Sequence, residues 1–475
     1  MRLFIQKSVI IQALVLAPIF LSAQVEIVSS TSSNKIHRIS INHNGVSNFS
    51  VETRGKIELT DDDKDIKSIS PDGYLEITKV TFGSKRSIKI TPTEKGIRRE
   101  YYEGREKIDF ETEGRKWLGE ILPELVRSTT IGAESRVNRF FKQGGTTAVL
   151  NELDEIESDH VKTAYANLLM KQNVAAKDYP SIISKVTSEV SSDHYRTEFL
   201  TGSMNKFLSS KEAMDAVFVA CGKMDSDHYK TQVIKEALEK QTPTVEGIKS
   251  IMLATTKMES DHYKTEVLTT LLDKDNLSDG VISEMINATK SMDSDHYRTQ
   301  VLTKAVTKKG LSSVSFQRVL ESVKEMNSDH YKTQVITELL NSKLNNELIT
   351  LAVDLSHSIS SDHYKAEVLT TMLKKQELTD DGFKKLVLEG SQTNSDHYAT
   401  EVLTTALQIP NLTNARIMAV LNAVTNINSD HYVTEVLTRA APKVRNDASL
   451  KDAYRAAAKK INSTTYYGQA LRAID

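Results

Sequence analysis

Cysteine is almost absent from this sequence: Cys221 is the only one, so no disulfide can form within the chain. The protein must therefore be held together by its apolar core, even in an oxidising compartment. Cys221 lies in a segment with a helical pattern and has no evident activating partner. We interpret it as a small buried residue and not as a reactive thiol.

An excess of either charge is also absent. The chain of 475 residues carries 61 basic and 63 acidic side chains, which gives a formal net charge of −2. A charge so close to zero for this size gives no reason to expect nucleic acid as a partner. The length favours more than one domain, and the composition is typical of a globular protein.

Long apolar runs are missing beyond the first 23 residues. Within residues 1–23, Arg2 and Lys7 precede the apolar stretch Val9–Ile19, and Leu21–Ala23 has the pattern of a cleavage site. The apolar stretch is shorter than a full membrane span. We therefore predict a signal peptide at 1–23 and no membrane span after its cleavage. The protein is expected to be exported, to the periplasm, the cell surface or the medium.

The common catalytic motifs are missing as well. The sequence has no His-Glu-x-x-His, no Gly-Lys-Ser/Thr phosphate loop and no Gly-x-Ser-x-Gly elbow. The acidic run Asp61–Asp65 lacks the alternating spacing of a calcium loop and is expected to be a solvated turn. The sequence therefore predicts neither an enzyme nor a bound cofactor.

A nine-residue motif, by contrast, returns throughout the last two-thirds of the chain. One copy, Ser260–Leu268, reads Ser-Asp-His-Tyr-Lys-Thr-Glu-Val-Leu, and a degenerate tenth copy begins at Ser463. Successive copies lie 34 residues apart, with one step of 33, and a fixed period of this length is typical of a solenoid or array. The motif aspartates are Asp159, Asp193, Asp227, Asp261, Asp295, Asp329, Asp362, Asp396 and Asp430.

Each repeat has the pattern of a helix hairpin. In the copy that begins at Ser260, the residues Tyr263, Val267, Leu268 and Leu271 fall on one apolar arc, and a second amphipathic helix follows Gly280. The motif serine is expected to cap the first helix with its hydroxyl group. One hairpin cannot bury its apolar faces, so neighbouring hairpins must stack into a continuous core. The period equals that of tetratricopeptide repeats, but their residue pattern is absent. We predict a mainly α fold, an α-solenoid of another kind with about nine repeats of 34 residues.

Different patterns precede the repeats. We predict a small antiparallel β domain over residues 24–112, a helical junction over 113–144, and the solenoid with its degenerate capping repeat over 145–475. From Phe49 onward, apolar residues alternate with polar ones, and glycine-containing turns separate the runs. Gln24–Asn48 reads as polar and irregular.

Two motifs ahead of the repeats carry a resemblance. Gly73–Ile77 reads Gly-Tyr-Leu-Glu-Ile, and Glu113–Leu118 reads Glu-Gly-Arg-Lys-Trp-Leu. With the Ser-Asp-His-Tyr repeats that follow, this layout resembles a group of exported bacterial helical-repeat proteins. It is also similar to the extracytoplasmic region of some antibiotic-sensing-type membrane metallopeptidases. The resemblance implies a β-hairpin segment followed by helical repeats. It does not extend to peptidase activity, because the His-Glu-x-x-His motif is missing.

The motif has a polar and an inward side. On a helical wheel the motif histidine and the residue four positions later form a polar ridge, whereas the aspartate leans toward the packed side. We predict that the nine motif aspartates act as an inter-repeat staple, in which carboxylates bond N–H groups of a helix start or of the neighbouring repeat. The candidate binding ridge consists of His194, His228, His262, His296, His330, His363 and His397.

A third motif position, three residues after the aspartate, is basic in the first seven copies. It becomes Ala399 and Val433 in the last two. Both a solvated helix face and a contact row along the ridge would explain this pattern. The basic residues are Lys162, Arg196, Lys230, Lys264, Arg298, Lys332 and Lys365.

The repeated histidines also suggest metal ligands, but two observations oppose this. The residue four positions after the histidine is Glu in five copies, Gln in three and Ala in one. Packed helices lie about 8–10 Å apart, too far for two histidines to share a zinc ion at about 2.0–2.1 Å per bond. The leading hypothesis is an exported, non-enzymatic scaffold whose solenoid presents an extended surface to a protein or peptide partner. The alternative is an extracytoplasmic metal- or pH-responsive sensor module that uses the row of histidines.

Overall fold

The computed structural model describes residues 24–29, 36–43 and 47–474, so the predicted signal peptide at 1–23 lies outside the described residues. The chain divides into two compact units, of which unit 1 ends at Ser203 and unit 2 begins at Met204. This division falls inside the predicted solenoid, where a helix that is continuous in other repeats is interrupted. In the part of the chain that the structure describes, no helix is both long and apolar enough to cross a membrane.

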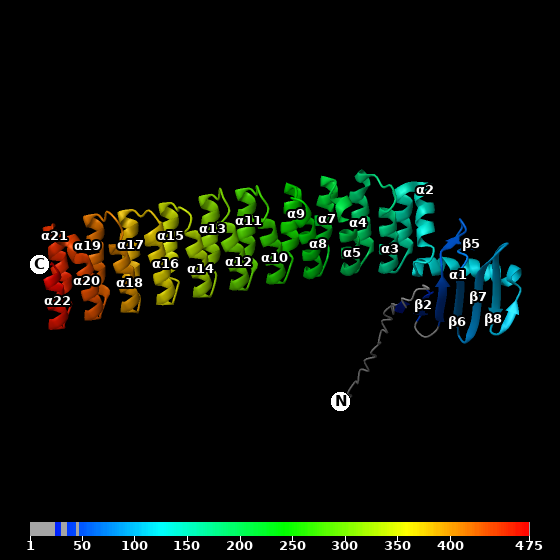
Figure 1. The fold of residues 1–475 in the computed structure, drawn as a ribbon, viewed down its shortest axis with the longest axis horizontal. Coiled ribbons are helices and arrows are strands. Elements are labelled where there is room, and N and C mark those ends of the chain that lie inside the picture. The colour runs from blue at the N-terminus through cyan, green and yellow to red at the C-terminus, as the bar shows by residue number, and fades with distance from the viewer. Residues whose placement is uncertain (1–23, 30–35, 44–46, 475) are drawn as a thin grey trace, which may run out of the picture. The chain divides into compact units, whose positions relative to one another are not determined.

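Unit 1 begins with an antiparallel sheet (Figure 1). Gln24–Asn48 was expected to be irregular, and this is wrong, because most of it forms the first two strands. Only a few apolar residues alternate in each of these strands, which makes a weak signal in the sequence. In spatial order the sheet contains β1 (Gln24–Ser29), β2 (Ile36–His43), β3 (Ser47–Arg54), β6 (Tyr74–Thr81), β7 (Ser84–Thr93), β8 (Gly96–Glu103) and β9 (Glu106–Ile108), and β4 (Ile57–Leu59) pairs separately with β5 (Ile66–Ile69).

The strand register places one apolar residue of each central strand in a continuous row. Ile39 lies opposite Val51, Val51 opposite Ile77, Ile77 opposite Ile88, and Ile88 opposite Tyr101. All five side chains are buried. Cross-strand neighbours of this kind stabilise a sheet and hold its register, because a slip by one residue would expose the whole row.

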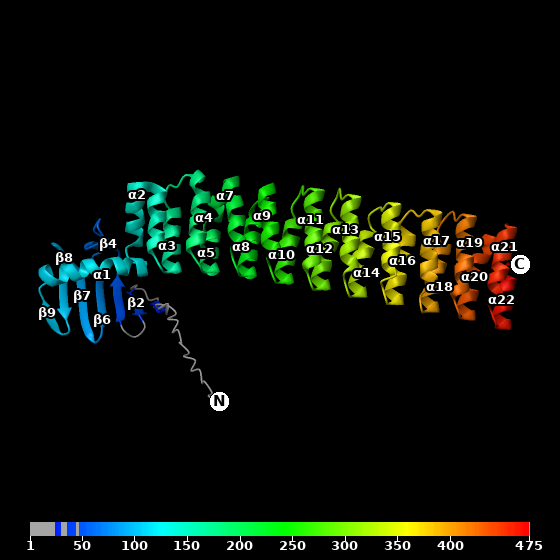
Figure 2. The ribbon, with the colours of Figure 1, turned by 180° about the vertical axis from the view of Figure 1, so that it is seen from behind.

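Helix α1 (Arg115–Ser128) covers this row and lies across the strands (Figure 2). It follows a short π-helical turn, Phe110–Gly114. Trp117 and Leu118 are buried against the sheet, and the ring of Trp117 lies 5.6 Å from that of Tyr101. The core of the β domain is therefore completed by the first helix of the predicted junction.

The rest of unit 1 is helical. The long helix α2 (Ala133–Glu152) contains a kink, because Gly145 has a φ of 62° and interrupts the helical backbone. Gly144 and Gly145 both have non-helical backbone angles, so they separate two helical segments within α2. The remaining helices are α3 (Asp159–Met170), α4 (Tyr179–Glu189) and α5 (Asp193–Gly202).

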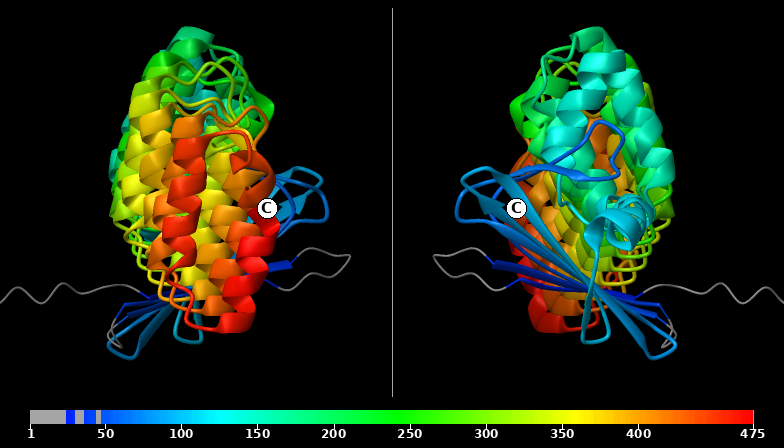
Figure 3. Two further views of the ribbon diagram at one scale, coloured as in Figure 1. Left: turned by 90° about the vertical axis from the view of Figure 1, so that its left-hand side faces the viewer. Right: turned by 90° about the vertical axis from the view of Figure 1, so that its right-hand side faces the viewer.

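Unit 2 is a series of helix hairpins in two layers (Figure 3). Helices that begin at a motif aspartate pack against one another and form layer A, while the intervening helices form layer B. The structure thus confirms the predicted fold class, helical repeats after a small antiparallel β domain. Layer A contains α8 (Asp227–Lys240), α10 (Asp261–Leu272), α12 (Asp295–Val306), α14 (Asp329–Leu339), α16 (Asp362–Lys375), α18 (Asp396–Leu407), α20 (Asp430–Val444) and α22 (Thr464–Ile474). Layer B follows the short α6 (Met204–Phe207) and contains α7 (Lys211–Cys221), α9 (Val245–Thr256), α11 (Asp279–Ala288), α13 (Ser313–Lys324), α15 (Asn346–Ser356), α17 (Asp380–Ser391), α19 (Asn414–Ala423) and α21 (Ala448–Ala458).

Candidate functional site

The motif serine precedes each layer A helix with an extended backbone, but its hydroxyl is not a general cap. Of the nine complete copies, all within the described residues, only that of Ser158 has a hydroxyl that accepts a capping hydrogen bond, from the N–H of Val161 at 3.4 Å. In the degenerate tenth copy, the hydroxyl of Ser463 accepts one from the N–H of Tyr466 at 3.5 Å. The serines of the eight other complete copies make no side-chain capping hydrogen bond, so the expected capping role is wrong for them. In most repeats the backbone N–H group of the serine instead donates a hydrogen bond to the motif aspartate of the preceding repeat.

The motif aspartate links the helix starts of two successive repeats. The carboxylate of Asp261 accepts hydrogen bonds from the backbone N–H groups of Asp293 and Ser294, both at 2.8 Å. These two groups lie just ahead of the next layer A helix. Seven aspartates accept from two such N–H groups and Asp362 accepts from one. Asp193 forms an ion pair with Arg196, as Asp227 does with Lys230 and Asp261 with Lys264. The seven are Asp159, Asp227, Asp261, Asp295, Asp329, Asp396 and Asp430.

The basic position does not form a surface row, which corrects both explanations offered for it. Lys230 and Arg298 are 3% and 5% exposed. The guanidinium of Arg298 donates to the carbonyl oxygens of Met292 and Ser322, which belong to the ends of two layer B helices or their following turns. The ammonium of Lys264 likewise donates to the carbonyl oxygen of Ser291. These cations satisfy carbonyl groups that a helix end leaves unpaired. Lys162, Lys230, Lys264, Arg298 and Lys332 are buried, and Arg196 and Lys365 are half-buried.

The motif threonine, four residues after the aspartate, has two different environments. In the first six copies its hydroxyl is buried and has no hydrogen-bonding partner within the described residues. In the last two copies, where Ala399 and Val433 replace the basic residue, Thr400 and Thr434 donate to the carbonyl oxygens of Asp396 and Asp430 at 2.7 Å. The six threonines without a partner are Thr163, Thr197, Thr231, Thr265, Thr299 and Thr333.

This difference predicts opposite effects for one substitution. Thr299→Val removes a buried hydroxyl that has no partner and should raise the free energy of unfolding by up to about 1 kcal/mol. Thr400→Val removes a hydrogen bond and should lower it by about 0.5–1.5 kcal/mol. Urea unfolding followed by circular dichroism measures both. Equal changes of the same sign would contradict the two environments.

The motif histidines and tyrosines of unit 2 form one continuous series of ring contacts, which we call the His–Tyr ladder. Within a repeat, His262 lies 5.1 Å from Tyr263, and across the interface it lies 5.7 Å from Tyr297. The series ends on Tyr466, in the degenerate tenth copy. The ladder consists of His228, His262, His296, His330, His363, His397 and His431 with Tyr229, Tyr263, Tyr297, Tyr331, Tyr364, Tyr398, Tyr432 and Tyr466.

The ladder is accessible to solvent. All seven histidines of the predicted ridge are exposed, six of them in the ladder and His194 in unit 1, where it lies 5.2 Å from Tyr195. The tyrosines were expected inside the apolar arc, but they are half-exposed and pack edge to face or tilted against imidazoles. Helical periodicity places a tyrosine on one side of a helix but does not reveal a histidine of the next repeat, so sequence reasoning missed the ring contacts.

Grooves flank the ladder. A cavity of about 490 Å³ is lined by His228, Gln232, Tyr263 and Glu266, and the buried Thr231 lies at its wall. A second, of about 700 Å³, opens on the other side of the same His228–Tyr263 contact. The hydroxyl of Tyr263 lies 3.3 Å from Nδ1 of His228, so the ladder also offers polar groups to a ligand.

Comparisons with known proteins add little. No family model matches this chain. No curated protein matches it either. A solved structure described as "Computational Design of Self-Assembling Cyclic Protein Homooligomers" aligns with 69% of this chain and 96% of its own, at 11% identity and a TM-score of 0.11. A likeness this slight carries no argument about fold or function.

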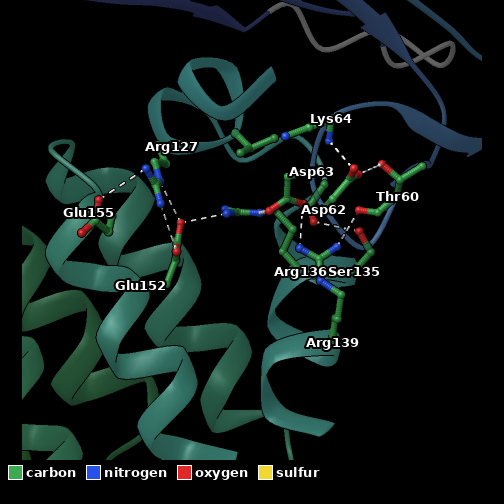
Figure 4. A network of polar contacts seen from close by, with 12 residues as sticks. Thr60, Asp62, Asp63, Lys64, Arg127, Ser135, Arg136, Arg139, Glu152 and Glu155 are labelled. Atoms are coloured by element: carbon green, nitrogen blue, oxygen red, sulfur yellow. Dashed lines mark hydrogen bonds and ion pairs between the residues drawn. The ribbon is translucent and has the colours of Figure 1, made fainter. Parts of the chain in front are cut away.

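The acidic run at Asp61–Asp65 is not merely a solvated turn, because two of its carboxylates bind arginines. Asp63 accepts from Arg136 at 3.0 Å and from Arg139 at 2.6 Å (Figure 4). Asp65 binds Arg99 at 2.9 Å and also contacts a second arginine. The charges of these two carboxylates are balanced by arginine.

Arg136 is the centre of this network, which joins the β domain to the first helical repeat of unit 1. It also binds Glu152 at 2.8 Å and the hydroxyl of the buried Tyr165 (Figure 4 draws the ion pairs). Glu152 in turn accepts from Arg127 at 3.0 Å. Burial raises the pKa of Tyr165 to about 12, so its hydroxyl stays protonated at neutral pH. The network therefore links the β domain to the helices through buried ion pairs.

Two further candidates from the sequence are the thiol of Cys221 and a metal site. Cys221 is fully buried, and burial raises the pKa of its thiol to about 12, so it is not a thiolate at neutral pH. Over the described residues, no group of three or more His, Cys, Asp and Glu side chains is arranged to hold a metal ion.

Proposed function

We propose that this protein is an exported, non-enzymatic binding scaffold whose helical repeats present an extended surface to a protein or peptide partner. The observation that carries the proposal is the His–Tyr ladder. The aspartates, serines and basic residues of the motif make contacts between repeats, whereas the histidines of the ladder are exposed. The pattern of residues 1–23 supports export.

The regular geometry of the ladder supports an extended partner. Each repeat offers the same imidazole and phenol groups, at ring separations that vary only from 5.6 to 6.0 Å across the interfaces of unit 2. Tyrosine and histidine provide contact area together with a hydrogen-bonding group, as at many protein interfaces. A repeating surface of this kind fits a linear segment better than a compact small molecule, because solenoids bind along their length.

A ladder variant tests the proposal. Full-length protein is used to select binders from a displayed peptide library, and the variant His262→Ser, His296→Ser and His330→Ser is tested against the same peptides. The substituted side chains are exposed, so the fold should persist while affinity falls about tenfold or more, since a few central contacts dominate most interfaces.

The matched control changes three exposed layer B residues, Lys249→Ser, Glu284→Ser and Gln317→Ser, on helices α9, α11 and α13. It should bind as the unmodified protein does. Melting curves establish that both variants are folded. If no selected peptide depends on the ladder, or if the control loses as much affinity, the ladder is not the binding surface.

A further inference from the structure

The His–Tyr ladder changes its charge along unit 2. In α12, the motif aspartate is balanced by Arg298, and the residue four positions after His296 is the neutral Gln300. The motifs of α8 and α14 have the same balance. In α18 and α20 the basic residue is absent, and the fourth position after the histidine is occupied by Glu401 or Glu435. These last two motifs each contain two carboxylates and no Lys or Arg.

The ladder glutamates of α16, α18 and α20 are accessible to solvent, although the motif of α16 still contains the basic Lys365, as that of α10 contains Lys264 beside Glu266. Glu367 and Glu401 are exposed and follow the ladder histidines His363 and His397 by four residues, which is about one helical turn. Neither of them forms an ion pair within the described part of the chain. Glu435 contacts Arg439 at 3.2 Å, but both side chains are at least 36% exposed. An exposed pair of this kind is weak and exchanges readily with another cation.

The rings beside these carboxylates favour the same ligand. Tyr398 lies 5.6 Å from His363, and Tyr432 lies 6.0 Å from His397, so Glu367 and Glu401 each follow, by four residues, a histidine that contacts a tyrosine of the next repeat. A guanidinium group can bind a carboxylate while it stacks on an aromatic ring, and arginine does this better than lysine.

We propose that the ladder over α16, α18 and α20 binds an extended basic peptide with arginine at every third position. The inference rests on the proposed function and names the class of its partner. The negative glutamates favour a ligand with positive side chains, and the distance between successive helices determines how far apart those side chains must lie. Packed helices repeat about every 8–10 Å. A polyproline II peptide advances about 3.1 Å per residue with three residues per turn, or about 9 Å per turn. Every third side chain of such a peptide therefore reaches the glutamate of the next layer A helix.

The test uses full-length protein and three fluorescent twelve-residue peptides. The first repeats Arg-Pro-Pro four times, the second has the same composition with its four arginines together, and the third repeats Glu-Pro-Pro. The variant Glu367→Gln, Glu401→Gln and Glu435→Gln is compared with the matched control Glu284→Gln, Glu325→Gln and Glu347→Gln, which removes the same charge from exposed positions outside the ladder.

The spaced arginine peptide should bind the unmodified protein and the control equally, and the ladder variant about tenfold more weakly, because three exposed ion pairs are lost. The clustered peptide should bind more weakly than the spaced one, and the acidic peptide should not bind. Equal binding of the spaced peptide to the ladder variant, or equal binding of the spaced and clustered peptides, would overturn the proposal.

Failure here is distinguishable from failure of the scaffold function. If the displayed library yields ladder-dependent peptides that are neutral or acidic, the scaffold stands and the basic-peptide proposal falls. If the library yields no ladder-dependent peptide at all, the proposed function itself falls. Competition by free spermidine at the concentration of the peptide would show that the carboxylates bind any polycation, which also contradicts a peptide register.

Discussion

Arg136→Ala is expected to lower the free energy of unfolding of unit 1 by about 3–5 kcal/mol, the usual cost of removing one partner from a buried ion pair. The side chain of Arg136 is 2% exposed and binds Asp63 at 3.0 Å and Glu152 at 2.8 Å. Its loss leaves each carboxylate with a single arginine, Arg139 or Arg127, and removes the side chain that joins Asp63 of the β domain to Glu152.

Trp117 makes this measurement specific, because it is the only tryptophan of the chain and lies buried in unit 1. Its fluorescence in urea therefore follows the unfolding of that unit in the full-length protein. The control is Arg127→Ala, which removes a ligand of the same Glu152 but from a side chain that is 36% exposed. The control should cost less than about 1 kcal/mol. Similar losses for both variants would show that Arg136 is not the centre of the network.

The same network should give unit 1 a dependence on pH. Burial alone would raise the pKa of Glu152, but the hydrogen bond from Arg127 and the charge of Arg136 outweigh it, so the pKa lies below its ordinary value. A carboxyl group whose pKa is lower in the folded protein stabilises the fold at pH values above its pKa in the unfolded chain, which is about 4.3 for glutamate. This stabilisation disappears as the pH falls through the pKa of the folded protein. The difference between the unmodified protein and Arg136→Ala should thus be constant near neutral pH and shrink below about pH 4. A difference that persists to lower pH would contradict an ionised Glu152.

The fold class was predictable because the repeat is strict. Thirty-four residues separate almost every pair of motif aspartates, and each stretch between them contains two amphipathic patterns, so only a stack of hairpins buries them all. Strands β1 and β2 were not predicted, since they are held largely by pairing with a neighbouring strand and not by their own alternation.

The site was predictable only in part. Helical phase places His262 outward and Asp261 toward the packed side, and phase depends on sequence alone. What lies opposite a side chain in the next repeat depends on how hairpins stack, which sequence periodicity does not contain. This is why Lys264 was expected on the surface but is buried, where it donates to the carbonyl oxygen of Ser291, and why Tyr263 was expected in the core but packs against His228.

Asp295→Ala is expected to destabilise unit 2 more than His296→Ala, although the two residues are adjacent. The carboxylate of Asp295 accepts from the backbone N–H groups of Asn327 and Ser328 at 2.8 and 2.7 Å. Alanine leaves both donors without this acceptor, and because the N–H of Ser328 is part-buried, the loss costs about 1–3 kcal/mol. Asp295 also begins α12, where a negative charge contributes a further fraction of a kcal/mol, about 0.3–1.

His296 is exposed and contributes ring contacts to Tyr297 and Tyr331 and a hydrogen bond with Gln300 at 2.8 Å. Its loss should cost less than about 1 kcal/mol, since surface substitutions rarely cost more. Unfolding in urea, followed by circular dichroism at full length, compares the two variants. A larger loss for His296→Ala would mean that the ladder, and not the aspartate, holds neighbouring repeats together.

The shape of the transition gives a second readout. A solenoid's stability is close to a sum of repeat and interface terms, so weakening one interface lets the hairpins on either side unfold independently. Asp295→Ala should therefore broaden the urea transition and lower its apparent slope, whereas His296→Ala should shift the midpoint slightly and keep the slope. Asp295→Asn retains one acceptor oxygen and should fall between them. If Asp295→Asn were as harmful as Asp295→Ala, the charge at the start of α12 would matter more than the two hydrogen bonds to the next repeat.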